Sequence, residues 1–156
     1  MTPQCVRLRF MLVGISLALA IHSVGQAANW PQWRGPQRNG VSEETGLLTE
    51  WPEEGPTLLW QKKDLGAGYS TPAVVGNRLY ILGSSGLDNE FVQALDIENN
   101  GEQIWRKRVG KVGEPEQRPP YPGARSTPTV DGDRLYVLGS DGDLLCMNAE
   151  NGDIWR

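Results

Sequence analysis

The sequence predicts an all-β fold, an incomplete β-propeller made of four-stranded antiparallel blades, and three features lead to this prediction. The stretch STPAVVGNRLYILGS at 70–84 recurs as STPTVDGDRLYVLGS at 126–140, with 11 of 15 positions identical. Tryptophans stand at positions 60, 105 and 155, at intervals of 45 and 50 residues, which is the length of a propeller blade. Helix is disfavoured because the 19 Gly and 11 Pro interrupt the chain and no segment after residue 27 keeps an apolar period of 3.6 residues.

Residues 1–27 have the pattern of a secretory signal peptide. Arg7 and Arg9 precede the apolar run 10–21, and the small residues Gly25 and Ala27 predict cleavage after Ala27. The run is shorter than the about 20 residues that a bilayer span needs. We therefore expect an exported chain, periplasmic or secreted, without a transmembrane span after cleavage; the alternative is an uncleaved N-terminal anchor.

The composition of the remaining residues, 28–156, excludes several classes of function. Cleavage leaves 13 Lys and Arg against 19 Asp and Glu, a net charge of −6 that repels the phosphate backbone of nucleic acids. The single histidine, His22, lies in the predicted signal peptide, which excludes Ser-His-Asp chemistry and His-ligated metals from the mature chain. Cys146 is the one remaining cysteine, and we expect a small buried strand residue there; a reactive thiol is the alternative.

A lead-in rich in Pro and Gly occupies residues 28–56. Its three tryptophans, Trp30, Trp33 and Trp51, are expected to pin the lead-in across the propeller surface. An aromatic platform for a ligand is the alternative interpretation.

The repeats occupy residues 57–156, with a first blade at about 70–110 and a second at about 126–156. Pro72 and Pro128 each open the first strand of a unit, and because proline cannot donate a ladder hydrogen bond, we expect this strand at a sheet edge. Hairpin turns are predicted where glycine meets an Asn or Asp between apolar runs, at 76–77, 100–101, 132–133 and 151–152. The strands RLYIL and RLYVL are apolar on both faces, which indicates that each sheet is covered on both sides. A β-sandwich is the alternative architecture.

The number of strands is too small for a closed ring. LLWQKK at 58–63 is expected to be the last strand of a preceding unit, so the chain would contain that strand and about one and three-quarter blades. Propellers have typically about 4 to 8 blades and close to hide their edges. We therefore expect a truncated product or one frame of a split gene, or a small protein that needs further blades from another chain.

The string TPAVVGNRLYILG…FVQALDIENNGEQIW resembles the repeat of PQQ-like β-propellers, a superfamily that includes quinoprotein alcohol dehydrogenases and the BamB-type scaffolds. Ala94, Asp96, Gly101 and Trp105 match the family ending AxDxxxGxxxW, with one extra residue before Gly101. The resemblance extends over residues 30–156, because the lead-in is also similar to that of exported bacterial members.

The second copy of the ending departs from the family pattern. Cys146 replaces the alanine, Asn148 replaces the aspartate, and Gly152 stands three residues before Trp155 instead of four. The second unit is therefore the weaker match.

The resemblance implies structural roles for the repeated residues. Trp60, Trp105 and Trp155 would dock between adjacent blades, together with the turn glycines Gly101 and Gly152. Stacking on a carbohydrate is the alternative for the three tryptophans.

The loop 112–125 offers the candidate ligand residues. Arg118, Tyr121 and Arg125 provide two guanidinium groups and a phenol, which suit a carboxylate or a sugar. A proline-stiffened connector is the alternative. The two DGD triplets at 131–133 and 141–143 are interpreted as turns, since neither continues into the ligand run of a calcium loop.

The predicted function is a non-catalytic binding or scaffold role, similar to BamB-type propellers, with a protein or a glycan as partner. No catalytic, cofactor-binding or metal-ligating residue is assigned. The alternative is the N-terminal part of a quinoprotein dehydrogenase, with PQQ and calcium as cofactors. That resemblance would imply a vicinal cysteine pair, which the sequence lacks.

Overall fold

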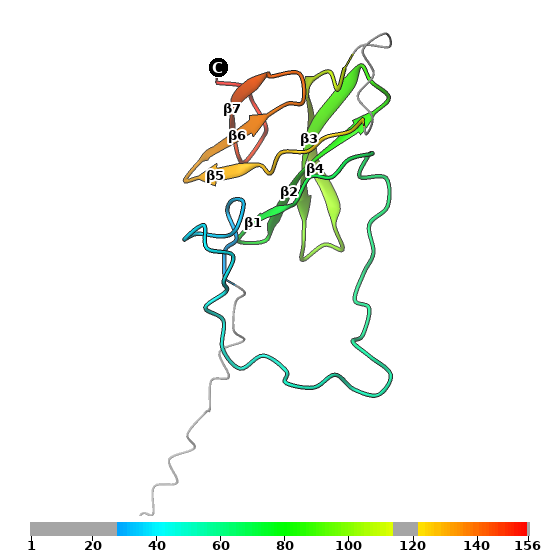
Figure 1. Ribbon diagram of the computed structural model, residues 1–156, viewed down its shortest axis with the longest axis vertical. Coiled ribbons are helices and arrows are strands. Elements are labelled where there is room, and N and C mark those ends of the chain that lie inside the picture. Colours follow the sequence, from blue (N-terminus) through cyan, green and yellow to red (C-terminus); the bar gives the residue numbers. More distant parts are fainter. Residues whose placement is uncertain (1–27, 114–121, 156) are drawn as a thin grey trace, which may run out of the picture.

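The computed structural model describes residues 28–113 and 122–155, which form two antiparallel β-sheets and no helix (Figure 1). The all-β prediction and the prediction of an unclosed propeller are confirmed. The predicted signal peptide lies outside the described residues, and so do Arg118 and Tyr121.

The first sheet is a four-stranded meander in the order β1-β2-β3-β4. Its strands are β1 (Ala73–Val75), β2 (Arg78–Ser85), β3 (Asn89–Asp96) and β4 (Glu102–Gly110). The predicted turn between β1 and β2 has Gly76 at φ +59°, a left-handed conformation that glycine adopts without strain.

The second sheet repeats this arrangement with three strands in the order β5-β6-β7. The strands are β5 (Thr129–Asp131), β6 (Arg134–Leu138) and β7 (Leu144–Asn148). A short fourth segment runs antiparallel to β7, where Trp155 N–H donates to Cys146 O at 2.7 Å and Met147 bridges to Ile154. The second sheet therefore has the start of a fourth strand, in the position that β4 has in the first sheet.

The core lies between the two sheets. Tyr80 and Leu82 of β2 are buried on the side that faces the second sheet, and Leu135, Val137 and Met147 are buried on the facing side of that sheet. Period-2 alternation places these residues on one face of each sheet, and their burial is the main apolar stabilisation of the pair.

The opposite face of the first sheet is covered by the chain that precedes it. Phe91, Gln93 and Leu95 of β3 are almost completely buried there, and Gln93 Nε2 donates to Leu65 O at 3.1 Å. The predicted cover on both faces is therefore present for the first sheet. It is present on only one face of the second sheet within the described residues, since Leu138 is exposed on the other face.

Residues 57–66, which contain the expected outer strand, do not form a strand. A strand needs a ladder partner, and within the described chain no strand pairs with these residues. The segment 41–59 runs away from the two sheets as a long excursion (Figure 1).

The first part of the lead-in joins the first strands of both sheets. Trp30 and Val74 exchange two backbone hydrogen bonds of 2.7 and 2.9 Å, and Val130 N–H donates to Pro31 O at 2.8 Å. Trp30 thus pins the lead-in as predicted. Trp33 and Trp51 are 61% and 68% exposed, so these two tryptophans do not pin it.

Candidate functional site: contacts between the two blades

In the turn between β3 and β4, a glycine without a side chain lies against the ring of Trp60. Gly101 has φ +71°, and its N–H donates to Asp96 O at 2.8 Å. A Cβ at this position would lie 2.8 Å from Cζ3 of Trp60, so the ring rests directly on the glycine. Both the dihedral angle and the lack of space require glycine here.

The same contact recurs one unit later. Gly152 has φ +73°, and its N–H donates to Asn148 O at 2.9 Å. A Cβ there would lie 2.7 Å from Cε3 of Trp105, a tryptophan of β4 that is 8% exposed. Trp105 also lies next to Tyr80, with ring centroids 6.1 Å apart. A tryptophan that precedes each turn in the chain therefore packs on that turn's glycine, and in the second case this contact joins the two sheets.

The Asn for Asp replacement in the second copy preserves the turn. Asp96 Oδ1 accepts hydrogen bonds from the backbone N–H groups of the residues two and three positions later, at 3.0 and 3.3 Å. Asn148 Oδ1 accepts the equivalent two bonds at 2.8 and 3.1 Å. An amide oxygen and a carboxylate oxygen are both acceptors, so either side chain builds this turn.

Trp155 occupies the third position of the series but is 49% exposed. The guanidinium of Arg134 lies 5.1 Å from the centre of its ring, a cation–π distance. Leu138 and Leu144 on the same sheet are 50% and 69% exposed. The far face of the second sheet is therefore an apolar surface that the described residues leave open.

Buried polar side chains join segments that lie far apart in the chain. Glu90 is fully buried, and its carboxylate accepts hydrogen bonds from Ser140 N–H at 2.6 Å and from Ser140 Oγ at 2.9 Å, which ties β3 to the β6–β7 loop. Ser84 Oγ donates to Ala67 O at 3.0 Å. Within residues 28–113 and 122–155, Nε1 of Trp105 is the only buried side-chain polar atom without a hydrogen-bond partner.

A cleft of about 380 Å³ opens between the turns of the two sheets. Arg78 Nη1 and Tyr80 Oη both donate to Ala149 O, at 3.3 and 3.1 Å, and Asp133 and Glu150 are among the residues that line the cleft. Burial raises the pKa of Tyr80 above its ordinary value, so this phenol stays a donor. The cleft could bind a small polar ligand. The sequence analysis did not predict this cleft, because its walls come from two different repeats. The only signal in the sequence is that the same turns occur at equivalent positions in both repeats.

Arg125 is the one predicted ligand residue that lies within the described part of the chain, so the grouping of Arg118, Tyr121 and Arg125 stays a prediction. Arg125 is exposed, with its guanidinium 5.6 Å from the ring centre of Tyr69, a residue that the sequence did not indicate. Cys146 lies on β7 as expected, but it is half-buried rather than buried.

The two DGD triplets lie in turns, with Gly132 at φ +60° and Gly142 at φ +96°. In the ranges 28–113 and 122–155, no group of three or more His, Cys, Asp or Glu side chains could hold a metal ion. Over the same ranges no helix has the length and apolar character of a membrane span.

Comparison with known proteins identifies the family. Residues 37–156 match the family model described as "Outer membrane protein assembly factor BamB". A protein of that name from Alkalilimnicola ehrlichii is 32% identical over 107 residues, which are 69% of this chain and 24% of the relative. The chain thus spans about a quarter of the length of this curated relative. The repeated strands, the turn glycines and these matches agree, and the chain belongs to the BamB-type family of PQQ-like repeat proteins.

Proposed function

We propose that this chain is an exported, non-catalytic repeat protein whose stacked sheets serve as a scaffold for a protein partner. The observation that carries the proposal is that the buried polar side chains bind other segments of the same chain. Glu90, Ser84 and Gln93 are buried, and each binds another segment of the same chain, so none of the three faces a substrate.

The partner class is inferred from the relative's name and from the exposed surface. The relative is named as an assembly factor of outer membrane proteins, and protein partners of that kind are proposed here. Trp33 and Trp51 are exposed on the lead-in, and exposed tryptophans are enriched at protein interfaces. Export is proposed from the signal-peptide pattern of residues 1–27. The proposed function does not include a cofactor.

Site-specific photocrosslinking tests this function. The full chain is produced in a bacterium with an outer membrane, with a photoreactive amino acid at Trp33 or Trp51 and, as a control, at the exposed Glu98 of the β3–β4 turn. We expect crosslinks to proteins of the outer-membrane assembly machinery from the tryptophan positions and few from Glu98. Equal crosslinking from all three positions, or a glycan bound in place of a protein, contradicts the proposal.

The dehydrogenase alternative has its own measurement. The exported chain is titrated with pyrroloquinoline quinone in the presence and absence of calcium, and binding is followed by tryptophan fluorescence. We expect no saturable binding. A calcium-dependent dissociation constant in the micromolar range would overturn the non-catalytic assignment.

A further inference from the structure

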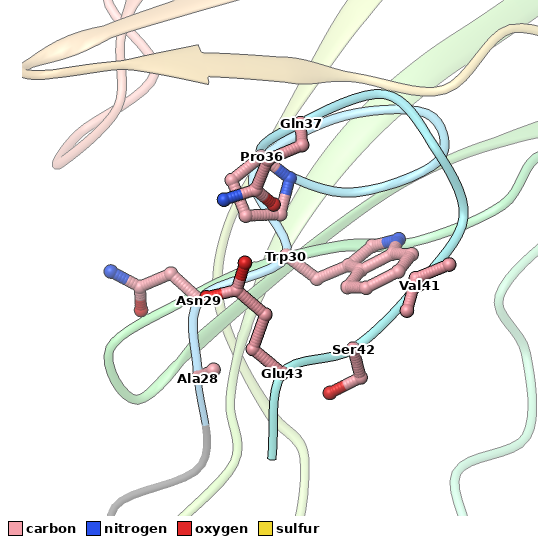
Figure 2. A pocket seen from close by; sticks show the side chains of 8 residues that line it. All are labelled: Ala28, Asn29, Trp30, Pro36, Gln37, Val41, Ser42 and Glu43. Atoms are coloured by element: carbon pink, nitrogen blue, oxygen red, sulfur yellow. The ribbon is translucent and has the colours of Figure 1, made fainter.

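The two edges of the first sheet differ in whether another segment covers them. At the β1 edge, Trp30 and Val74 exchange two backbone hydrogen bonds of 2.7 and 2.9 Å, and Asn29 Oδ1 accepts one of 2.8 Å from Gly76 N–H. Figure 2 shows Trp30 in this covering segment, with Val41 beside its ring. The lead-in therefore closes this edge of the sheet.

The opposite edge is formed by β4, a strand of nine residues that pairs only with β3. Within residues 28–113 and 122–155, no bridge or backbone hydrogen bond joins another segment to 103–109. Alternate N–H and C=O groups of an antiparallel strand point away from its partner, so this edge can accept a further strand. The ladder with β3 is regular from Trp105 to Arg108 and shifts register on either side, at Ile104 and Val109. The stretch 105–108 is therefore the part that an added strand can extend.

Three consecutive cationic side chains, Arg106, Lys107 and Arg108, lie in this stretch. Because side chains alternate along a strand, Arg106 and Arg108 share one face and Lys107 lies on the other. Arg106 Cζ lies 3.2 Å from the ring centre of Phe91, and Arg108 Nη2 donates to a backbone carbonyl of the β2–β3 turn at 3.0 Å. Among the described residues, the one carboxylate at ion-pair distance from the three is that of Asp153, 3.5 Å from Lys107 Nζ. The edge is thus cationic, although residues 28–156 carry a net charge of −6.

We propose that the β4 edge at 105–108 binds an extended, acidic segment of the protein partner as an added β-strand. Backbone hydrogen bonds between this segment and β4 would provide the affinity. Carboxylates of the segment would lie beside Arg106 and Arg108 on one face and beside Lys107 on the other, as opposite charges do in cross-strand pairs. The inference rests on the proposed function and deepens it, because it names the surface and the chemistry of the partner.

The same charges disfavour a second copy of this chain at this edge. Two β4 strands side by side would bring the cations of 106–108 opposite one another, and like charges directly opposite destabilise a strand pair. Charged side chains on edge strands prevent self-pairing of natural sheets in this way. An acidic strand replaces this repulsion by attraction, so the edge selects its partner by charge.

The experiment measures peptide binding to the full exported chain by fluorescence anisotropy. The probe is a labelled synthetic peptide of alternating Glu and Val, compared with a peptide that has Lys in place of Glu and with the Glu peptide N-methylated at alternate amides. Loss of two or more backbone hydrogen bonds should weaken binding of the N-methylated peptide roughly tenfold or more. The Lys peptide should not bind measurably.

Variants of the chain locate the site. Arg108→Gln should weaken binding of the Glu peptide roughly two- to fivefold, through the loss of one cross-strand charge pair. The matched control is Arg38→Gln, the same change in the lead-in beside the covered β1 edge, and it should leave binding unchanged. Far-ultraviolet circular dichroism checks that both variants fold, and the comparison of the three peptides on the wild type holds even if one does not.

The outcomes separate this inference from the proposed function. Equal affinity for the N-methylated peptide refutes strand addition, and equal affinity for the Lys peptide refutes the acidic partner. Dimers of the chain in sedimentation velocity that the Glu peptide dissociates would show that a second copy occupies the edge, and this would overturn the proposal. Crosslinks from Trp33 and Trp51 to partner proteins without peptide binding at β4 refute only the inference, whereas peptide binding without those crosslinks counts against the proposed function.

Discussion

The substitution Gly152→Ala tests the contact that joins the two sheets. The new Cβ would lie 2.7 Å from Cε3 of Trp105, a buried ring that also contacts Tyr80. The φ angle of +73° adds a backbone cost of about 1 kcal/mol for a residue with a Cβ. Overpacking a filled interface costs roughly 1–3 kcal/mol more. We therefore expect the free energy of unfolding to fall by about 2–4 kcal/mol, a large fraction of the stability of a small domain.

The matched control is Gly132→Ala in the β5–β6 turn. Gly132 has nearly the same left-handed angle, φ +60°, but a Cβ there would meet no atom within 4 Å. Its loss should be limited to the backbone cost of about 1 kcal/mol. Both variants are unfolded in urea and followed by far-ultraviolet circular dichroism, which reports mainly the backbone. Equal losses in the two variants would refute the argument that the ring fills the space above Gly152.

Two further substitutions test the polar contacts. Glu90→Gln should lower the free energy of unfolding by about 1–3 kcal/mol in the same urea assay, because the amide weakens the two bonds that the buried carboxylate accepts from Ser140. The control is the exposed Glu150→Gln, which should change the free energy of unfolding by less than about 0.5 kcal/mol. A similar loss in both variants would contradict the role of Glu90. Tyr80→Phe should cost about 1 kcal/mol through the lost bond to Ala149 O. Burial raises the folded pKa of Tyr80 above its unfolded value, so its contribution is complete below about pH 10 and is lost as the pH rises through the folded pKa. Unfolding measured at pH 8 and pH 11 should show this extra decline in the wild type and not in Tyr80→Phe, and identical declines would exclude it.

The repeat and its turns could be predicted from the sequence because they depend on local chemistry. The Gly-Asx dipeptides at 76–77 and 132–133 require a left-handed glycine wherever they occur in a tight hairpin, and both turns form. The apolar pattern of RLYIL likewise indicated a covered strand. What covers it could not be predicted, because the segment around Leu65 has no strand pattern and packs through its backbone carbonyl on Gln93.

The candidate site was harder to predict than the fold, because its parts come from segments far apart in the chain. The cleft beside Tyr80 combines turns of both repeats, and its central acceptor is a backbone carbonyl, Ala149 O, which no side-chain motif can indicate. Trp33 and Trp51 share a residue type and a Pro/Gly-rich context with Trp30. Only the pairing of Trp30 with Val74 separates the pinned tryptophan from the two exposed ones.

The irregular spacing of the second ending was interpreted as a weaker match, but the structure shows how both spacings bring tryptophan to the same place. In the first sheet Ala94 pairs with Trp105 and the next pair is Leu95 with Gln103, so a β-bulge takes up Ile104. In the second sheet Trp155 N–H donates to Cys146 O, and the next residues, Met147 and Ile154, pair without an extra residue. The bulge thus absorbs the one residue by which the distance from glycine to tryptophan differs. The shared requirement is therefore a tryptophan beside the strand position of Ala94 or Cys146, and the number of residues between turn and tryptophan can vary as long as the ladder accommodates it.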